Sequence, residues 1–148
     1  MTMKFNIGLL LALGGAIAGV GAEGINCKGN ARCAQLSLYT QVKNYVAIID
    51  GVDPNRWYNN GEHIACIKAD VPTGLYFSDH ISSCVFLQNS GGAPGHSLPP
   101  LIKLLREHGC KGCGSVPLFA PQGNNNVADG ELTVNYVSDT YGCDYGLC

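Results

Sequence analysis

The chain has 148 residues, a formal net charge of −2 at neutral pH and 8 cysteines. This length fits a single globular domain. The slight excess of acidic residues excludes the basic surface that binds nucleic acid, and no polybasic segment is directed at anionic lipid. The composition therefore indicates a small, cysteine-rich domain with neither nucleic acid nor anionic lipid as an expected partner.

Residues 1–22 predict a secretory signal peptide. Lys4 supplies the positive charge, residues 7–20 form an apolar stretch, and Val20-Gly21-Ala22 is a small-residue cleavage site. The apolar stretch is shorter than the roughly 20 residues that span a bilayer. All the cysteines follow it, and an even number of cysteines in a secreted chain indicates a disulfide framework. We therefore expect a secreted, extracellular domain over residues 23–148.

The first predicted element of this domain is a helix over 37–49. Leu38, Val42, Tyr45 and Ile49 recur on one helical face. Before it, the segment from Cys27 to Cys33 is predicted to be a polar loop between two anchors.

Strands are predicted next. Residues 63–69 alternate as a strand does, and two short strands over 75–78 and 81–88 would be joined by a hairpin turn at Asp79-His80. Residues 131–137 show the clearest strand alternation.

A second helix is predicted between these strands, from Ser97, a candidate cap, to His108. Pro99 and Pro100 suit the first turn of a helix, and Gly109 suits the residue that follows its end. The residues of its apolar face, where we expect a partly buried histidine, are Leu101, Leu104, Leu105 and His108. The order helix, strands, helix, strand predicts an α+β fold with both helices on one face of an antiparallel sheet.

Three segments together carry a family resemblance. They are GINCKGNARC (24–33), REHGCKGCGSVPLFA (106–120) and GELTVNYV (130–137). In these segments the chain resembles the fungal killer-protein-four family, which groups virus-encoded killer toxins of a smut fungus with proteins encoded in fungal genomes. The resemblance implies an α/β-sandwich, in which an antiparallel sheet carries two antiparallel helices on one face and is stapled by disulfides.

The resemblance also implies part of the disulfide framework. The family pairs its two N-terminal cysteines with the two at the end of the second helix, which gives Cys27–Cys110 and Cys33–Cys113 here. The other four cysteines would then pair among themselves. We expect Cys143 to join one of the sheet cysteines and Cys148 to join the other, the sheet cysteines being Cys66 and Cys84.

The activity that the resemblance implies is inhibition of voltage-gated calcium channels, which blocks the growth of competing fungi. The chain departs from the family at a position that bears on this activity. A lysine stands two residues before the family's counterpart of Cys66, and here that position is Ile64. The nearest lysine is Lys68. The typical toxin is also basic, whereas this chain is mildly acidic.

The C-x-x-C of residues 110–113 has other readings in principle. A redox centre needs a thiol of low pKa, usually at a helix N-terminus, and this pair follows a helix instead. Zinc held by Cys27, Cys33, Cys110 and Cys113 is possible by spacing, but a structural disulfide suits a secreted chain better. No nucleophile, phosphate-binding or metal-ligand motif is present, so we expect neither an enzyme nor a cofactor.

Two functional hypotheses remain for a monomeric protein. The first is a killer-toxin-like protein that binds a membrane target such as a calcium channel through Lys28, Arg32, Lys68 and Lys111. The second is an effector that binds a host protein or wall component through the Arg56-Trp57-Tyr58 loop or residues 89–95, since Trp, Tyr and Arg are typical of binding hot spots. Trp57 covering a sheet edge is the structural alternative. The basic residues that could converge on one face, or stay dispersed in solvent, are Lys28, Arg32, Lys43, Lys68, Lys103, Arg106 and Lys111.

Overall fold

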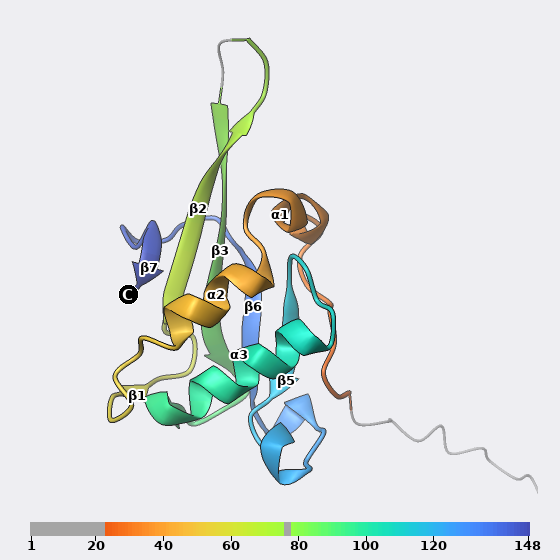
Figure 1. Ribbon diagram of the computed structural model, residues 1–148, viewed down its shortest axis with the longest axis vertical. Helices are drawn as coiled ribbons and strands as arrows, with labels where there is room; N and C mark the ends of the chain where they lie inside the picture. Colours follow the sequence, from red (N-terminus) through yellow and green to blue (C-terminus); the bar gives the residue numbers. More distant parts are fainter. Residues whose placement is uncertain (1–22, 76–77) are drawn as a thin grey trace, which may run out of the picture.

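The computed structural model describes residues 23–75 and 78–148 (Figure 1). The predicted signal peptide, and part of the strand predicted over 75–78, lie outside these residues. No helix among the described residues combines the length and the apolar composition needed to cross a membrane.

An antiparallel five-stranded sheet in the order β5-β6-β3-β2-β7 forms one layer of the fold. A small two-stranded sheet pairs β1 with β4 beside it. The strands are β1 (Trp57–Tyr58), β2 (Ala65–Pro72), β3 (Ser78–Gln88), β4 (Ala93–Pro94), β5 (Gly114–Pro117), β6 (Glu131–Val137) and β7 (Tyr145–Leu147).

Helices form the second layer. Helices α2 and α3 lie side by side and run in opposite directions across one face of the sheet, with α1 near the end of α3 (Figure 1). This arrangement confirms the α+β sandwich with two antiparallel helices on one face. The helices are α1 (Cys33–Tyr39), α2 (Val42–Ile49) and α3 (Leu98–Glu107), with 3-10 turns η1 (Gly95–Ser97), η2 (Ala120–Gln122) and η3 (Val127–Asp129).

The first predicted helix is interrupted, so the prediction of one helix over 37–49 was wrong. The backbone is extended at Thr40 and Gln41. The side chain of Thr40 is fully buried, and its hydroxyl lies 2.9 Å from the Ser83 hydroxyl on β3. This contact draws the chain inward between the two helices, so α2 starts as a separate helix. Helix α1 starts at Cys33, the last residue of the predicted loop.

The second predicted helix is confirmed as α3. Leu101, Ile102 and Leu105 are fully buried, and Gly109 takes a left-handed conformation with φ of 96°, which glycine adopts at low cost. Two details were wrong. The Ser97 hydroxyl donates to the Pro94 carbonyl rather than capping the helix, and His108 is exposed because it forms the C-cap, where the chain leaves the core.

The prediction of a turn at Asp79-His80 was also wrong. Both residues lie within β3, whose residues 78–85 pair with the whole of β2. His80 Nδ1 lies 2.7 Å from Asp70 Oδ1 on β2, so a cross-strand pair of polar residues extends the hairpin. The hairpin projects beyond the helices (Figure 1). The shorter strands β1, β4, β5 and β7 were not predicted, whereas 131–137 is confirmed as β6.

The core lies between the sheet and the helices. Sheet residues Ile67, Val85 and Val134 face α2 and α3 and are buried. The fully buried Tyr45 of α2 reaches the sheet, where its hydroxyl donates to the Ser83 carbonyl at 2.6 Å. The helix layer is therefore fixed to the sheet by apolar packing and by buried hydrogen bonds.

The structure contains the two disulfides that the resemblance implies, Cys27–Cys110 and Cys33–Cys113. We call this pair of bonds the double staple. The expected pairing of the other four was wrong, because the bonds are Cys66–Cys84 and Cys143–Cys148. Cys66 and Cys84 lie directly opposite each other on β2 and β3, and the tail doubles back so that Cys143 bonds Cys148, 5 positions further along the chain.

Candidate functional site

A groove beside the double staple gathers three basic side chains from separate parts of the chain. Lys43 comes from α2, Arg106 from α3 and Lys111 from the segment between the staple cysteines. The hollow measures about 540 Å³. We call it the basic groove, and its lining residues are Ser37, Leu38, Gln41, Lys43, Arg106, Gly109, Cys110 and Lys111.

Local structure holds the basic groove in shape. The backbone N–H of Val42 donates to the Lys111 carbonyl at 2.7 Å, which ties the first turn of α2 to the staple segment. Gly112 packs so closely on α1 that an added Cβ would lie 2.0 Å from the Cys33 carbonyl oxygen. Because Lys111 lies between two disulfides and beside this contact, its backbone has little freedom to move.

The electrostatics of the basic groove are one-sided. None of its lining residues is acidic, within the part of the chain that the structure describes. The charge of Arg106 is partly compensated by Glu107, whose Oε1 lies 3.6 Å from Arg106 Nη2, and both side chains are exposed. Leu38, which is 73% exposed, adds an apolar contact at the rim. A cluster of cations next to an exposed apolar side chain suits a partner with negative charge beside apolar surface.

A second hollow, of about 310 Å³, lies along the sheet and contains Arg32 and Lys68. Its charges are mixed, because Asp79 and Asp139 line it too. The guanidinium of Arg32 lies 5.1 Å from the ring centre of Tyr136 and donates to its hydroxyl at 3.3 Å. Both cations of this hollow are therefore engaged or partly compensated within the protein.

Lys68 is engaged by the tail. Its Nζ lies 3.4 Å from Asp144 Oδ2. The Thr140 hydroxyl, which donates to Asp144, and the nearby Lys68 charge hold the pKa of the Asp144 carboxyl below its ordinary value. At neutral pH the carboxylate is therefore ionised and compensates Lys68.

The other predicted binding residues lie elsewhere. Lys28 is exposed and forms an ion pair with Glu23. Because Arg32 and Lys111 line different hollows, the double staple does not assemble them into one described groove. Lys43 and Arg106 line the groove with Lys111 because α2 packs on α3. This packing cannot be predicted from the local sequence around either residue.

Trp57 lies in β1 and is 54% exposed. Its indole packs against the backbone of the opposite loop, since a Cβ added to Gly92 would lie 2.4 Å from the indole nitrogen. The neighbouring Arg56 stacks 4.5 Å from the ring centre of Tyr58 and forms an ion pair with Glu62. Trp57 thus covers part of the small sheet and keeps half of its surface for contact.

The cysteines supply no thiolate. Two groups, His63 with Cys66 and Cys84, and Cys66 with Cys143 and Cys148, have ligand atoms close enough to surround an ion, within the described residues. All the sulfurs involved are bonded in disulfides, as are those of 110–113. Disulfide sulfur lacks the charge of the thiolate that metal binding and redox exchange require.

The sequence comparisons agree with this framework. The pattern of the Kp4 family matches residues 10–138. The KP4 killer toxin of Ustilago maydis P4 virus is 32% identical to this chain over 120 residues, which cover 78% of this chain and 80% of the toxin. The chain belongs to the Kp4 family. It is a killer-toxin-like protein by descent, and the resemblance seen in the sequence is confirmed.

Within this Kp4 protein, the surroundings of Ile64 explain why an apolar side chain, and not a lysine, suits this position. Ile64 is fully buried in the main core, immediately before β2. A lysine there would bury a charge, unless the local backbone were rearranged. The cations of this chain lie at other positions, and three of them, Lys43, Arg106 and Lys111, line the basic groove.

Proposed function

We propose that this Kp4 protein is a secreted, non-enzymatic toxin that inhibits the growth of competing fungi or host cells by blocking a calcium channel. Membership of the killer-toxin family and the disulfide-rich framework support secretion and toxicity. The observation that carries the choice of surface is the convergence of Lys43, Arg106 and Lys111 on one groove.

The mechanism follows from the charge of a cation channel. Such channels concentrate cations with rings of carboxylates at their mouths. A lysine on a rigid support can occupy this field and compete with calcium, and the double staple holds Lys111 in this way. Binding alone obstructs the path, so no covalent step is required.

The test compares charge reversals that change net charge equally. We expect purified protein to inhibit fungal or plant-root growth and to reduce calcium current, with added calcium relieving both effects. Lys111→Glu should weaken inhibition by about tenfold or more, because like charges would face each other at the channel. Lys28→Glu, outside the basic groove, is the matched control and should leave inhibition unchanged.

Two results would count against this function. Purified protein that neither inhibits growth nor changes calcium current, with or without added calcium, would remove the toxin assignment. Equal loss of inhibition with Lys28→Glu and Lys111→Glu would leave the toxin assignment but remove the basic groove as its surface.

The half-exposed Trp57 favours a second candidate, an effector that binds a host protein or wall component. A large aromatic side chain with a free face is a typical binding anchor. For this candidate, Trp57→Ala should abolish binding, whereas reversal of Lys68 or Lys111 should preserve it. The toxin proposal expects the opposite pattern from the Lys111 and Trp57 variants.

A further inference from the structure

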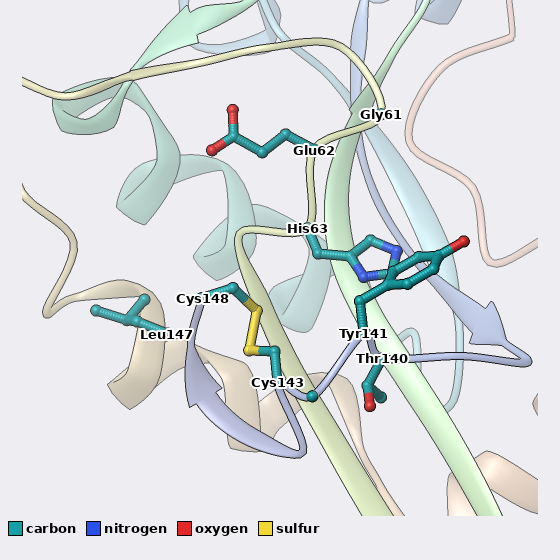
Figure 2. A pocket seen from close by; sticks show the side chains of 9 residues that line it. Gly61, Glu62, His63, Thr140, Tyr141, Cys143, Leu147 and Cys148 are labelled. Atoms are coloured by element: carbon teal, nitrogen blue, oxygen red, sulfur yellow. A yellow bond between two sulfur atoms is a disulfide. The ribbon is translucent and has the colours of Figure 1, made fainter.

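A hollow of about 570 Å³ lies between the C-terminal tail and the loop that leads into β2 (Figure 2). Glu62 and His63 line it from the loop, and Tyr141, Leu147 and the Cys143–Cys148 disulfide line it from the tail. We call it the tail pocket. Its volume falls within the roughly 300–1,000 Å³ of small-molecule sites, and none of the basic-groove residues line it.

A second hollow of about 250 Å³ continues past His63 and is lined by Asn60, Phe86 and Gln88 among others. His63 belongs to both hollows. Its ring centre lies 5.6 Å from that of Tyr141 and 6.1 Å from that of Phe86, so three rings follow one another along the two hollows. Figure 2 shows the rings of His63 and Tyr141 beside the disulfide.

Tyr141 is presented to solvent by an unusual backbone. Its φ of 53° is positive, and Asn89 is the one other non-glycine residue of this kind among the described residues. The Asp139 carboxylate accepts the Tyr141 N–H at 2.7 Å and holds the turn. A non-glycine residue in this conformation costs free energy, and such strain often occurs at binding sites. Here the strained turn keeps a ring that is 83% exposed beside the tail pocket.

The side chains that line the two hollows favour a neutral ligand, because among the described residues they include no lysine or arginine and their one acidic group, Glu62, is already paired with Arg56. Glu62 lines the tail pocket, and its carboxylate accepts the backbone N–H of Asn59 and pairs with Arg56. These contacts hold the pKa of Glu62 below its ordinary value, so it is negative at neutral pH. The amide side chains of Asn60 and Gln88 supply neutral hydrogen-bonding groups in the smaller hollow.

We propose that the two hollows form one binding groove for a neutral oligosaccharide, with Tyr141 and Phe86 as stacking platforms. A pyranose ring has a face of C–H groups that packs on an aromatic ring, and hydroxyls around its rim that bind amides and carboxylates. The row of rings with polar groups beside them matches this pattern. The inference does not rest on the toxin activity, because the surface is a different one.

The experiment titrates the purified protein with two ligands, a β-linked hexamer of N-acetylglucosamine and a β-linked hexamer of glucose. Binding is followed by calorimetry and by amide chemical shifts. We expect at least one of the two sugars to bind at millimolar concentration or below and to shift the amides of Gly61, His63 and Tyr141.

Tyrosine variants assign the site. Tyr141→Ala should weaken binding by about tenfold, because it removes the aromatic ring and the apolar area that the ring buries against the sugar. Tyr141→Phe keeps the ring and should retain binding. Tyr145→Ala is the matched control, because Tyr145 is 76% exposed on β7 and lines neither hollow. Thermal unfolding of each variant checks the fold.

Three outcomes would overturn the proposal. One is the absence of binding by both oligosaccharides at millimolar concentration. Another is equal weakening by Tyr141→Ala and Tyr145→Ala. The third is a set of shifted amides that lies away from both hollows. Loss of sugar binding in a variant that still inhibits growth would separate this site from the toxin surface.

Discussion

The two sides of the molecule carry the same number of disulfides but use them differently. On one side the double staple joins residues 83 and 80 positions apart, tying the N-terminal segment and α1 to the end of α3. On the other side the bonds join residues 18 and 5 positions apart, within the β2–β3 hairpin and within the tail. The comparison teaches that the long-range bonds constrain the whole fold, whereas the short-range bonds act locally, one between buried neighbours on β2 and β3 and the other in the tail.

The packing differs in the same direction. Helices α2 and α3 cover the main apolar core and Leu36 of α1 packs in a second, smaller cluster, whereas the strand β7 pairs with β2 only over residues 65–67. The basic groove thus lies on a support fixed by long-range disulfides and by the core, whereas the tail pocket lies on one fixed by a short strand pairing and a few hydrogen bonds to β2. The rigid side suits a fixed charge.

The largest expected effect comes from removing the double staple. The first long-range bond closes a loop of about 80 residues. Once it has formed, the second bond closes a ring of only about ten residues, so removing both should cost about 7 kcal/mol of stability through chain entropy. Removing Cys143–Cys148 should cost about 2 kcal/mol. Since domains are stable by roughly 5–15 kcal/mol, we expect the variant without the double staple to be largely unfolded.

Urea denaturation of alanine variants measures this difference. The first variant replaces Cys27, Cys33, Cys110 and Cys113, and its control replaces Cys143 and Cys148. Similar losses of unfolding free energy in the two variants would contradict the distinction between fold-wide and local bonds.

An intermediate effect is expected from a pair of leucine truncations. Leu105→Ala should lower the free energy of unfolding by about 2–5 kcal/mol, because it opens a cavity in a fully buried position of α3. Leu147→Ala on β7 should cost about 1 kcal/mol or less, because that side chain is 43% exposed. Thermal and chemical denaturation of both variants provide the measurement, and a larger loss for Leu147→Ala would reverse the comparison.

The smallest effect concerns acid and the tail. Since the folded-state pKa of Asp144 lies below its ordinary value of 3.8, its ionised form favours the folded tail above that value. This contribution is lost as pH falls through the lower folded pKa. The Lys68 backbone N–H donates to the Asp144 carbonyl, so hydrogen exchange of this amide reports on the tail.

We expect the Lys68 amide to lose protection on acidification, after correction for the intrinsic exchange rate, while amides of the helix-covered core keep theirs. Asp144→Asn should remove this pH dependence, since the amide still accepts from Thr140 but carries no charge. Unchanged pH dependence in that variant would show that another group governs the tail.

Parts of this fold could be predicted because their signals are local. Residues 131–137 and the apolar face of α3 show clear periods, and they appear as β6 and α3. The break between α1 and α2 could not be predicted, because the Thr40–Ser83 contact joins residues 43 positions apart. The same holds for β3, where a cross-strand partner keeps a turn-like Asp79-His80 pair extended.

The candidate site divides in the same way. The position of Lys111 between two staple cysteines follows from sequence and family resemblance. Its grouping with Lys43 and Arg106 follows from the packing of α2 on α3, and the exposure of Tyr141 follows from a turn conformation that few non-glycine residues adopt. Such features depend on tertiary context, which overrides local preference.

The outer edge of β2 has a consequence for self-association. Strand β7 covers residues 65–67, and no other strand of the described chain pairs with the remainder of that edge. An open edge invites another chain to add to the sheet, but charged residues and proline oppose such pairing. Here Lys68, Asp70 and Pro72 occupy this stretch. This edge of β2 is thus protected against edge-to-edge pairing with another chain.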